Sequence, residues 1–299
     1  MGRNTKQVGK VLTNLFEDQN KFTIKALATL DGVLYPLSDE QKIKYTKDYI
    51  EYLHAELVEV LNNVPWKKHR YTGKTDRHAL VEELIDVQKF LWGLMSIWEV
   101  DEEEFAEVYK NKTLVVEQRF KQEHVFKKEL SDTEKIAVID IDDVIANWRQ
   151  GFSDWVTDNY TYNTTEFAPN TALRELLKVE ARQNGIMRTL KLKEGVLDGL
   201  GKLNQAGYLI VFLTARPVSE CPRLITDTIV WLAEHNLPSS YVYFSDANKH
   251  IFIMDNFPNA KVLFDDDDMI IAKAKKSGYN AIKVTTTLEK AVDEFLWKL

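Results

Sequence analysis

KIAVIDIDDVIANW, residues 135–148, is the stretch that decides the fold of the C-terminal half of this chain. Its apolar run, Ile136 to Ile139, has the length and the β-branched content of a buried parallel strand. Asp140 and Asp142 follow at the point where this strand would end, which is where open α/β sheets place their ligand sites. Two carboxylates in that position can act as a nucleophile and an acid/base, and both can hold Mg²⁺. Because aspartate is also a common turn residue, an isolated Asp-x-Asp has little meaning by itself.

Three later segments place polar residues at the ends of further strand-like runs. These residues are Thr214 after YLIVFL, Lys249 shortly after YVYFS, and Asp265 and Asp266 after KVLF. In a doubly wound sheet, the ends of such strands converge on one crevice. Acidic groups there can hold a magnesium ion, while a hydroxyl and an ammonium bind phosphoryl oxygens. The four segments together therefore predict a phosphoryl-transfer site at one edge of a parallel sheet.

This half of the chain, roughly residues 133–299, resembles the haloacid dehalogenase (HAD) superfamily of phosphatases. The residues that match its motifs are Asp140, Asp142, Thr214, Lys249, Asp265 and Asp266. The resemblance implies that Asp140 forms an aspartyl-phosphate, and that Asp142 protonates the leaving oxygen and then activates water. It also implies that Mg²⁺ is held by Asp140, by the backbone carbonyl of Asp142, and by Asp265 or Asp266.

One position departs from the superfamily pattern, because many members have a threonine where this chain has Val144. The change removes a hydroxyl but no expected ligand or nucleophile. Within the superfamily, DIDDVIANW and FLTARP look most similar to the small 5′-nucleotidases and deoxyribonucleotidases.

The segment from about 148 to 195 lies between the first two motifs. It is rich in aromatic residues and contains a helical pattern at 172–183. The resemblance implies that it forms a small helical cap, which can exclude water and contact the leaving group. Its aromatic side chains either stack on a nucleobase or form the core of the cap.

The first 128 residues show long amphipathic helical patterns and few strand-like runs. Two of these patterns carry acids three residues apart, Glu56 with Glu59 and Glu83 with Asp86. Residues at this spacing lie on one face of a helix. Carboxylates among apolar neighbours are costly unless they are paired or bound to a metal, so two such helices would offer four ligands to Mg²⁺. Ordinary surface acids on amphipathic helices give the same spacing.

Residues 14–122 resemble the all-alpha NTP pyrophosphatase superfamily (MazG-like), close to its dimeric dUTPase branch. The resemblance rests on the two acid pairs, on VPWKKHR after the first pair, and on KNK and RF farther along. It implies that Glu56, Glu59, Glu83 and Asp86 bind Mg²⁺. The substrate contacts that it implies are Gln19, Trp66, Lys67, Lys110, Asn111 and Arg119. Two positions differ from the family, the Lys68–His69 region and Asn62, and they leave the base preference open.

The composition of the chain agrees with a two-domain enzyme. At 299 residues the chain is long for one core and sufficient for two. A single cysteine, Cys221, cannot form an internal disulfide, and the sequence has neither an 18-residue apolar run nor an apparent signal peptide. We therefore expect a cytoplasmic protein that does not contact membranes. The net charge of −7 argues against nucleic acid as a partner.

The sequence thus predicts a multidomain protein: an all-α helical bundle at 1–128, followed at 129–299 by an α/β, Rossmann-like HAD domain with a small helical cap. We expect a bifunctional, Mg²⁺-dependent hydrolase. The first domain would convert a deoxynucleoside triphosphate, dUTP or dCTP, to the monophosphate and pyrophosphate, and the second would remove the remaining phosphate. The helical domain is expected to form a homo-oligomer, a dimer or a tetramer.

Alternative functions remain open at this stage. The HAD domain could act as a phosphatase on nucleic acid 3′-ends or on a small metabolite unrelated to the first domain. In either case the helical domain would be a nucleotide sensor or an oligomerisation module.

Overall fold

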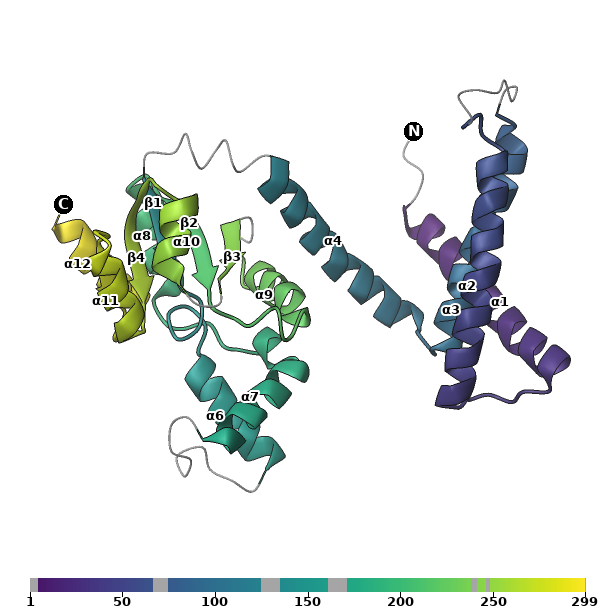
Figure 1. Cartoon of the computed structure of the whole chain (residues 1–299), viewed down its shortest axis with the longest axis horizontal. Helices are drawn as coiled ribbons and strands as arrows, with labels where there is room; N and C mark the ends of the chain where they lie inside the picture. Colours follow the sequence, from purple (N-terminus) through teal and green to yellow (C-terminus); the bar gives the residue numbers. More distant parts are fainter. Residues whose placement is uncertain are drawn as a thin grey trace. The chain divides into compact units, whose positions relative to one another are not determined.

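The computed structural model describes residues 5–66, 75–124, 135–160, 171–237, 241–245 and 248–298 (Figure 1). The chain forms two compact units, Met1–Tyr109 and Lys110–Leu299. The division falls within α4 (Glu102–His124), whereas the boundary expected from the sequence, at 128, lies outside the described residues. The order of the elements, helices first and then a parallel sheet with helices, confirms the predicted fold class.

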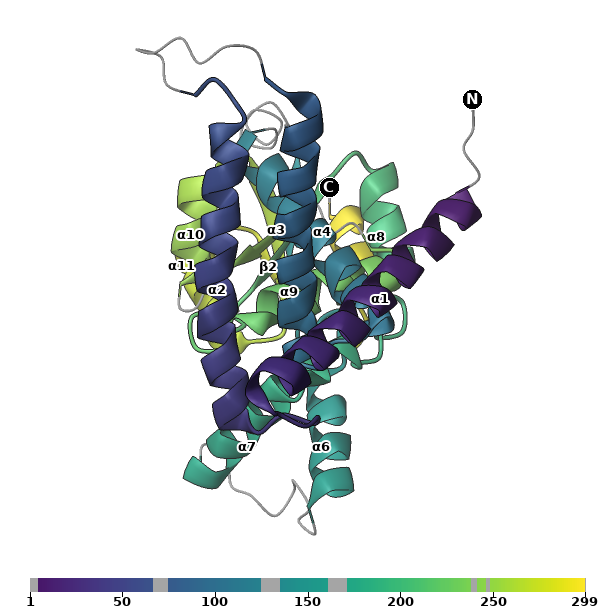
Figure 2. The same ribbon diagram turned by 90° about the vertical axis from the view of Figure 1, so that its right-hand side faces the viewer.

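The first unit consists of α1 (Thr5–Asp31), α2 (Asp39–Asn62), α3 (Arg77–Ile97) and the start of α4. In Figure 2, α2 and α3 run side by side and α1 crosses them. The α2 helix begins with a capping box, in which the Ser38 hydroxyl and the Gln41 side chain each accept a hydrogen bond from the other residue's backbone N–H. Asp76 caps α3 in a similar way, because its carboxylate accepts from the backbone N–H groups of His78 and Ala79.

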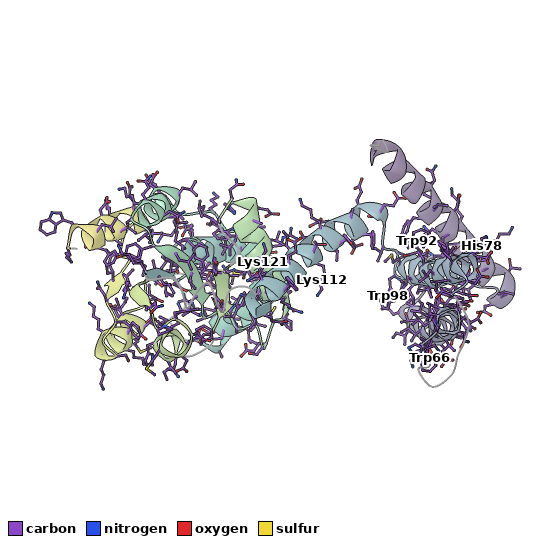
Figure 3. The ribbon with its side chains drawn as sticks, turned by 90° about the horizontal axis from the view of Figure 1, so that it is seen from above. Trp66, His78, Trp92, Trp98, Lys112 and Lys121 are labelled. Atoms are coloured by element: carbon purple, nitrogen blue, oxygen red, sulfur yellow. The ribbon has the colours of Figure 1, made fainter. Side chains whose placement is uncertain are left out.

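The core of the first unit is small and lies near one end of the helices. Its fully buried members are Leu27, Leu37, Tyr45 and Ile97. Trp98, labelled in Figure 3, closes this end by donating from its indole Nε1 to the Thr46 hydroxyl at 2.9 Å. Many apolar side chains farther along α2 and α3 are exposed, including Leu57, Val58, Leu61, Leu84 and Ile85.

The second unit is built on a five-stranded parallel sheet in the order β3-β2-β1-β4-β5. The strands are β1 (Ile136–Ile139), β2 (Leu209–Thr214), β3 (Val242–Phe244), β4 (Ala260–Asp265) and β5 (Ala281–Lys283). Side chains alternate between two cores: Ile139 and Phe212 belong to one, and Val138 and Val211 to the other. The sheet is therefore buried on both faces, which explains why its strands are continuous apolar runs.

Helices cover both faces of this sheet, and two more helices extend beyond one end of it. The helices that follow the strands are α8 (Val196–Gln205), α9 (Arg223–Glu234), α10 (Lys249–Asn256), α11 (Asp268–Lys276) and α12 (Leu288–Trp297). The insertion after β1 forms α6 (Trp148–Asn159), α7 (Ala172–Gln183) and the short 3₁₀ helix η2 (Ile186–Arg188). Figure 1 shows α6 and α7 together beyond the end of the sheet to which the β2 arrow points.

The late turns of α4 also belong to the second unit. Val115 is buried in its larger core, and the side-chain amides of Gln118 and Gln122 donate to the Val242 carbonyl oxygen at 3.1 and 2.7 Å. Across the described ranges of both units, no helix combines the length and the apolar character that crossing a bilayer requires.

Candidate functional site

The central strand β1 positions Asp140. Because β1 pairs with β2 on one side and β4 on the other, its C-terminal end lies in the middle of the sheet. The backbone N–H of Asp140 continues the ladder by donating to the Phe264 carbonyl at 2.9 Å, and the residue is only 5% exposed. The chain then turns through Asp143, which has a positive φ of 60°.

Lys249 connects the ends of β1 and β4. Its Nζ donates to Asp140 Oδ1 at 2.6 Å and to Asp265 Oδ2 at 2.7 Å, and all three side chains are buried. Burial lowers the pKa of the Lys249 ammonium, but the two carboxylates outweigh it and raise that pKa to about 12. Burial also raises the pKa of Asp140, and the Lys249 ammonium opposes this rise.

Three carboxylates at this place suit a divalent cation. Oxygens of Asp140, Asp265 and Asp266 all lie within 4.8 Å of one another. Burial, together with the nearby Asp265 and Asp143 carboxylates, raises the pKa of Asp266 to about 6. An all-oxygen donor set of this kind is what Mg²⁺ prefers, and the cation would relieve the repulsion among the three groups.

Asp142 is held by an arginine that the sequence analysis did not identify. Arg216 binds it with two hydrogen bonds, from Nε to Oδ2 at 3.0 Å and from Nη2 to Oδ1 at 2.7 Å. The guanidinium is itself fixed, because its Nη1 donates to the Thr228 hydroxyl at 2.7 Å. Arg216 lies two residues after Thr214 in TARP, and this proximity to a motif residue was the available signal. Thr214 is fully buried, and its hydroxyl accepts from the backbone N–H of Arg216 at 3.3 Å.

A cavity of about 380 Å³ lies above these groups. Its floor includes Asp140, Asp142, Lys249, Asp265 and Asp266, which come from the ends of different strands and from α10. Its other wall includes the basic residues Arg174, Lys178 and Arg182 of α7. The sequence analysis expected a cap here but did not single out these three cations, although they recur every four residues within the predicted helix.

The acids of the first unit form a second cluster. Glu56 and Glu59 of α2 and Glu83 of α3 each bring one oxygen to within 4.8 Å of the others. Burial and neighbouring carboxylates raise the pKa of both Glu56 and Glu83. Asp86 is close enough to contribute to both shifts, and its carboxylate accepts from Lys89 Nζ at 3.0 Å.

The substrate contacts expected in the helical domain are distributed over several elements. Gln19 lies on α1 and donates to the Thr23 hydroxyl at 3.3 Å, and Trp66 is about half exposed just beyond α2. Lys67 lies outside the described residues. The remaining three, Lys110, Asn111 and Arg119, are on the part of α4 that belongs to the second unit.

Comparisons with known proteins give limited matches. No family model matches the sequence. The membrane-associated phosphatidylinositol transfer protein 3 of Mus musculus and of Homo sapiens is 32% identical over 60 residues, which is 20% of this chain. The matched stretch is 6% of the length of these curated relatives.

Several solved structures are similar to a little over half of the chain. A hydrolase from Streptococcus pneumoniae TIGR4 aligns over 56% of this chain and 99% of its own, with 11% identity and a TM-score of 0.38. A haloacid dehalogenase-like family hydrolase from Streptococcus pneumoniae covers 55% and 91%, with 10% identity and a TM-score of 0.38. A HAD-superfamily hydrolase from Ehrlichia chaffeensis covers 55% and 96%, with 13% identity and a TM-score of 0.34.

Proposed function

We propose that the second unit is a phosphomonoesterase that forms a phosphorylated intermediate on Asp140. The observation that carries this proposal is the position of Lys249, whose ammonium bridges Asp140 and Asp265 at the ends of the neighbouring strands β1 and β4. A buried lysine beside a metal-type carboxylate cluster can bind the oxygens of a phosphoryl group and stabilise the charge that develops on them. The acidic floor alone would repel a phosphate.

The roles of the individual residues follow from these contacts. Lys249 binds Oδ1 of Asp140, which leaves Oδ2 to attack phosphorus while the bond from phosphorus to the ester oxygen breaks. Asp142 would give a proton to that leaving oxygen. In the second step Asp142 would take a proton from water, the water oxygen would attack phosphorus, and inorganic phosphate would leave Asp140. Arg216 orients Asp142 for both transfers.

The residues that would hold Mg²⁺ in this unit are Asp140, Asp265 and Asp266. When bound, the cation supplies positive charge that lets a phosphate dianion approach the carboxylates.

For the first unit we propose hydrolysis of a deoxynucleoside triphosphate to the monophosphate and pyrophosphate. The short distances among the carboxylate oxygens of Glu56, Glu59 and Glu83 support this activity, because a divalent cation would relieve the repulsion among these groups. Asp86 is the fourth proposed Mg²⁺ ligand, and dUTP or dCTP is the proposed substrate. A deoxynucleoside monophosphate is a phosphomonoester, so the product of the first reaction belongs to the substrate class of the second.

The first unit is also the proposed site of self-association. Apolar residues on α2 and α3 are exposed although a soluble helix hairpin normally buries them, which supports a dimer or tetramer formed by these helices. Light scattering on the full chain tests this proposal. We expect a mass above that of one chain, and a lower mass for Leu84→Glu. Leu30→Glu on α1, which is also exposed, is the control. A monomeric wild-type chain would contradict the proposal.

One experiment tests both activities. The full chain is incubated with Mg²⁺ and each common NTP and dNTP, including dUTP, and the products are followed by chromatography. We expect pyrophosphate first and free nucleoside later, with Asp140→Asn stopping at the monophosphate and Glu83→Gln preventing cleavage of the triphosphate.

Two matched controls remove an acid elsewhere in each unit. Asp198→Asn, on the exposed surface of α8, and Glu82→Gln, next to Glu83, should behave like the wild type. If triphosphates stay intact while monophosphates are hydrolysed, the proposed first activity is wrong. The first unit would then be a nucleotide sensor or an oligomerisation module. If no monophosphate releases phosphate, the proposed second activity is wrong.

A further inference from the structure

Three basic residues form a row on the cap helix α7. Arg174, Lys178 and Arg182 are spaced four residues apart, so they lie on one face of the helix, and all three line the cavity above Asp140. On the floor of this cavity, Lys249 is the side chain that we propose to bind the transferred phosphoryl group. The row on α7 is therefore a separate basic feature on the opposite wall.

Two of these three side chains carry a buried donor atom without a hydrogen-bond partner among the described residues. The Nε atoms of Arg174 and Arg182 are buried and donate no hydrogen bond to any described residue, whereas Lys178 Nζ donates to the Glu175 carboxylate at 2.7 Å. A buried donor on a charged group is expensive to leave unsatisfied. Arginine remains charged at neutral pH in proteins, so these groups do not escape the cost by losing a proton. A ligand that accepts hydrogen bonds would remove it.

The cap holds at least one of these guanidiniums in place. The Arg182 guanidinium lies 5.7 Å from the centre of the Trp148 ring, and Trp148 stacks on Phe152 at 5.3 Å. The helix itself is anchored, because Leu177 is buried in the main core and the Gln183 carbonyl accepts from Arg223 at 2.6 Å. A cation that is positioned before the ligand arrives loses less entropy on binding.

The cations of the floor, in contrast, are fully used. Lys249 is shared between Asp140 and Asp265, and Arg216 is bound to Asp142. A substrate with an uncharged leaving group would bring no negative charge to Arg174 and Arg182. A second anionic group on the leaving group would meet Arg174 and Arg182 while its phosphomonoester meets the floor.

We infer that the preferred substrate of the phosphatase site is a small phosphomonoester that carries a second phosphoryl group, which Arg174 and Arg182 bind. This inference rests on the proposed phosphatase function and narrows its substrate class. The cavity volume of about 380 Å³ is near the lower end for small-molecule pockets, which favours a free bisphosphate over a polynucleotide end. The net charge of −7 points the same way.

Three substrates separate the possible outcomes. The full chain with Mg²⁺ is given thymidine 5′-monophosphate, thymidine 3′,5′-bisphosphate, or the 5′-phosphorylated dinucleotide, whose second charge is a phosphodiester. We expect kcat/KM for the bisphosphate to exceed that for the monophosphate by roughly tenfold or more, as one or two charge-assisted hydrogen bonds would give. We expect the dinucleotide to fall below the bisphosphate. A ratio near one between bisphosphate and monophosphate overturns the inference, and a clear preference for the dinucleotide overturns its small-molecule form.

The variants Arg174→Gln and Arg182→Gln test whether α7 causes the preference. Each should lower the ratio of the two kcat/KM values by several-fold, and the double variant should bring it close to one. Because both substrates are measured on the same protein sample, partial unfolding cancels in this ratio. Arg188→Gln is the control: it removes a guanidinium that lies on the adjacent η2 and pairs with Glu234. It should leave the ratio unchanged.

Failure of the proposed function gives a different result from failure of this inference. If wild-type protein releases no phosphate from any of the three esters or from p-nitrophenyl phosphate, the phosphatase proposal itself is wrong. If phosphate is released in an Asp140-dependent way without a preference for the second phosphoryl group, only the inference about α7 is wrong.

Discussion

Replacing Lys249 with methionine would test the charge arrangement on which the candidate active site depends. The ammonium lies 2.6 Å from Asp140 and 2.7 Å from Asp265, and the three side chains are between 1% and 8% exposed. Methionine keeps much of the volume and removes the charge, so two buried carboxylates lose their shared partner. Breaking a buried ion pair by removing one partner costs about 3–5 kcal/mol. Solvent screening does not reduce this figure for groups buried to this degree.

The loss of stability should depend on pH in a defined direction. Burial raises the pKa of Asp140, and the Lys249 ammonium opposes this rise, so its removal raises that pKa further. A group with a raised pKa in the folded state contributes stability below its unfolded pKa and loses it as the pH rises through the folded value. The variant should therefore be closer to wild type at about pH 5 than at about pH 8, because acid neutralises the unpaired carboxyl group.

Hydrogen exchange of the β1 and β4 amides measures this effect in the full chain, because it reports on the opening of the second unit alone. A loss of about 3–5 kcal/mol speeds exchange by roughly two to three and a half orders of magnitude. The matched control is Lys283→Met, which removes the same kind of contact from the exposed pair with Asp268 at 2.6 Å. This surface pair should contribute at most about 1 kcal/mol. Equal effects of the two substitutions, or a larger loss at acid pH for Lys249→Met, would refute the reasoning.

Three further predictions concern the other charged groups. Arg216→Lys keeps the charge but loses the two-pronged contact with Asp142, so kcat/KM for a phosphomonoester should fall about tenfold or more, and a change of less than about twofold would argue against a positioning role. Because the pKa of Asp266 is raised to about 6, the apparent Mg²⁺ affinity of the second unit should rise as the pH passes this value and then level off. A Mg²⁺ affinity that stays constant from about pH 5 to about pH 8 would contradict this prediction. The pKa of Glu83 is raised, so without metal the first unit loses stability as the pH rises through the pKa that Glu83 has in the folded chain. Glu83→Gln should therefore raise the melting temperature of the first unit in EDTA at neutral pH. The same substitution should remove the additional stabilisation by Mg²⁺. Glu82→Gln should do neither, and identical melting curves for the two variants would count against a metal site.

The fold class could be predicted because its signals are local. The β1, β2 and β4 strands are continuous apolar runs, and the residue that ends each run is polar, so both the strand and its end are visible in the sequence. The α1 to α4 helices are visible in the sequence for the same reason. The spacing of Glu56 and Glu59 similarly predicts a shared helix face, which requires no knowledge of the tertiary structure.

The partners of Asp142 and the row on α7 could not be found in this way. Arg216 is 74 residues from Asp142 in sequence, and only the pairing of β1 with β2 brings them together. Arg174 and Arg182 have the spacing of any solvated helix face, and their importance depends on the packing of α7 over the strand ends. Charge roles that depend on burial and on distant neighbours are therefore missed by patterns of spacing.

The contact between α4 and β3 has a consequence for the solubility of the second unit. β3 is at the edge of the sheet, and an uncovered edge strand is a template for pairing with another chain. Gln118 and Gln122 occupy the Val242 carbonyl oxygen, and the helix that carries them lies against the same core. A shortened chain that began at Lys135 would keep every residue of the candidate phosphatase site but lose this protection, and we expect it to aggregate. A chain that began at Lys110 would keep the contact of Gln118 and Gln122 with β3 and should remain monodisperse.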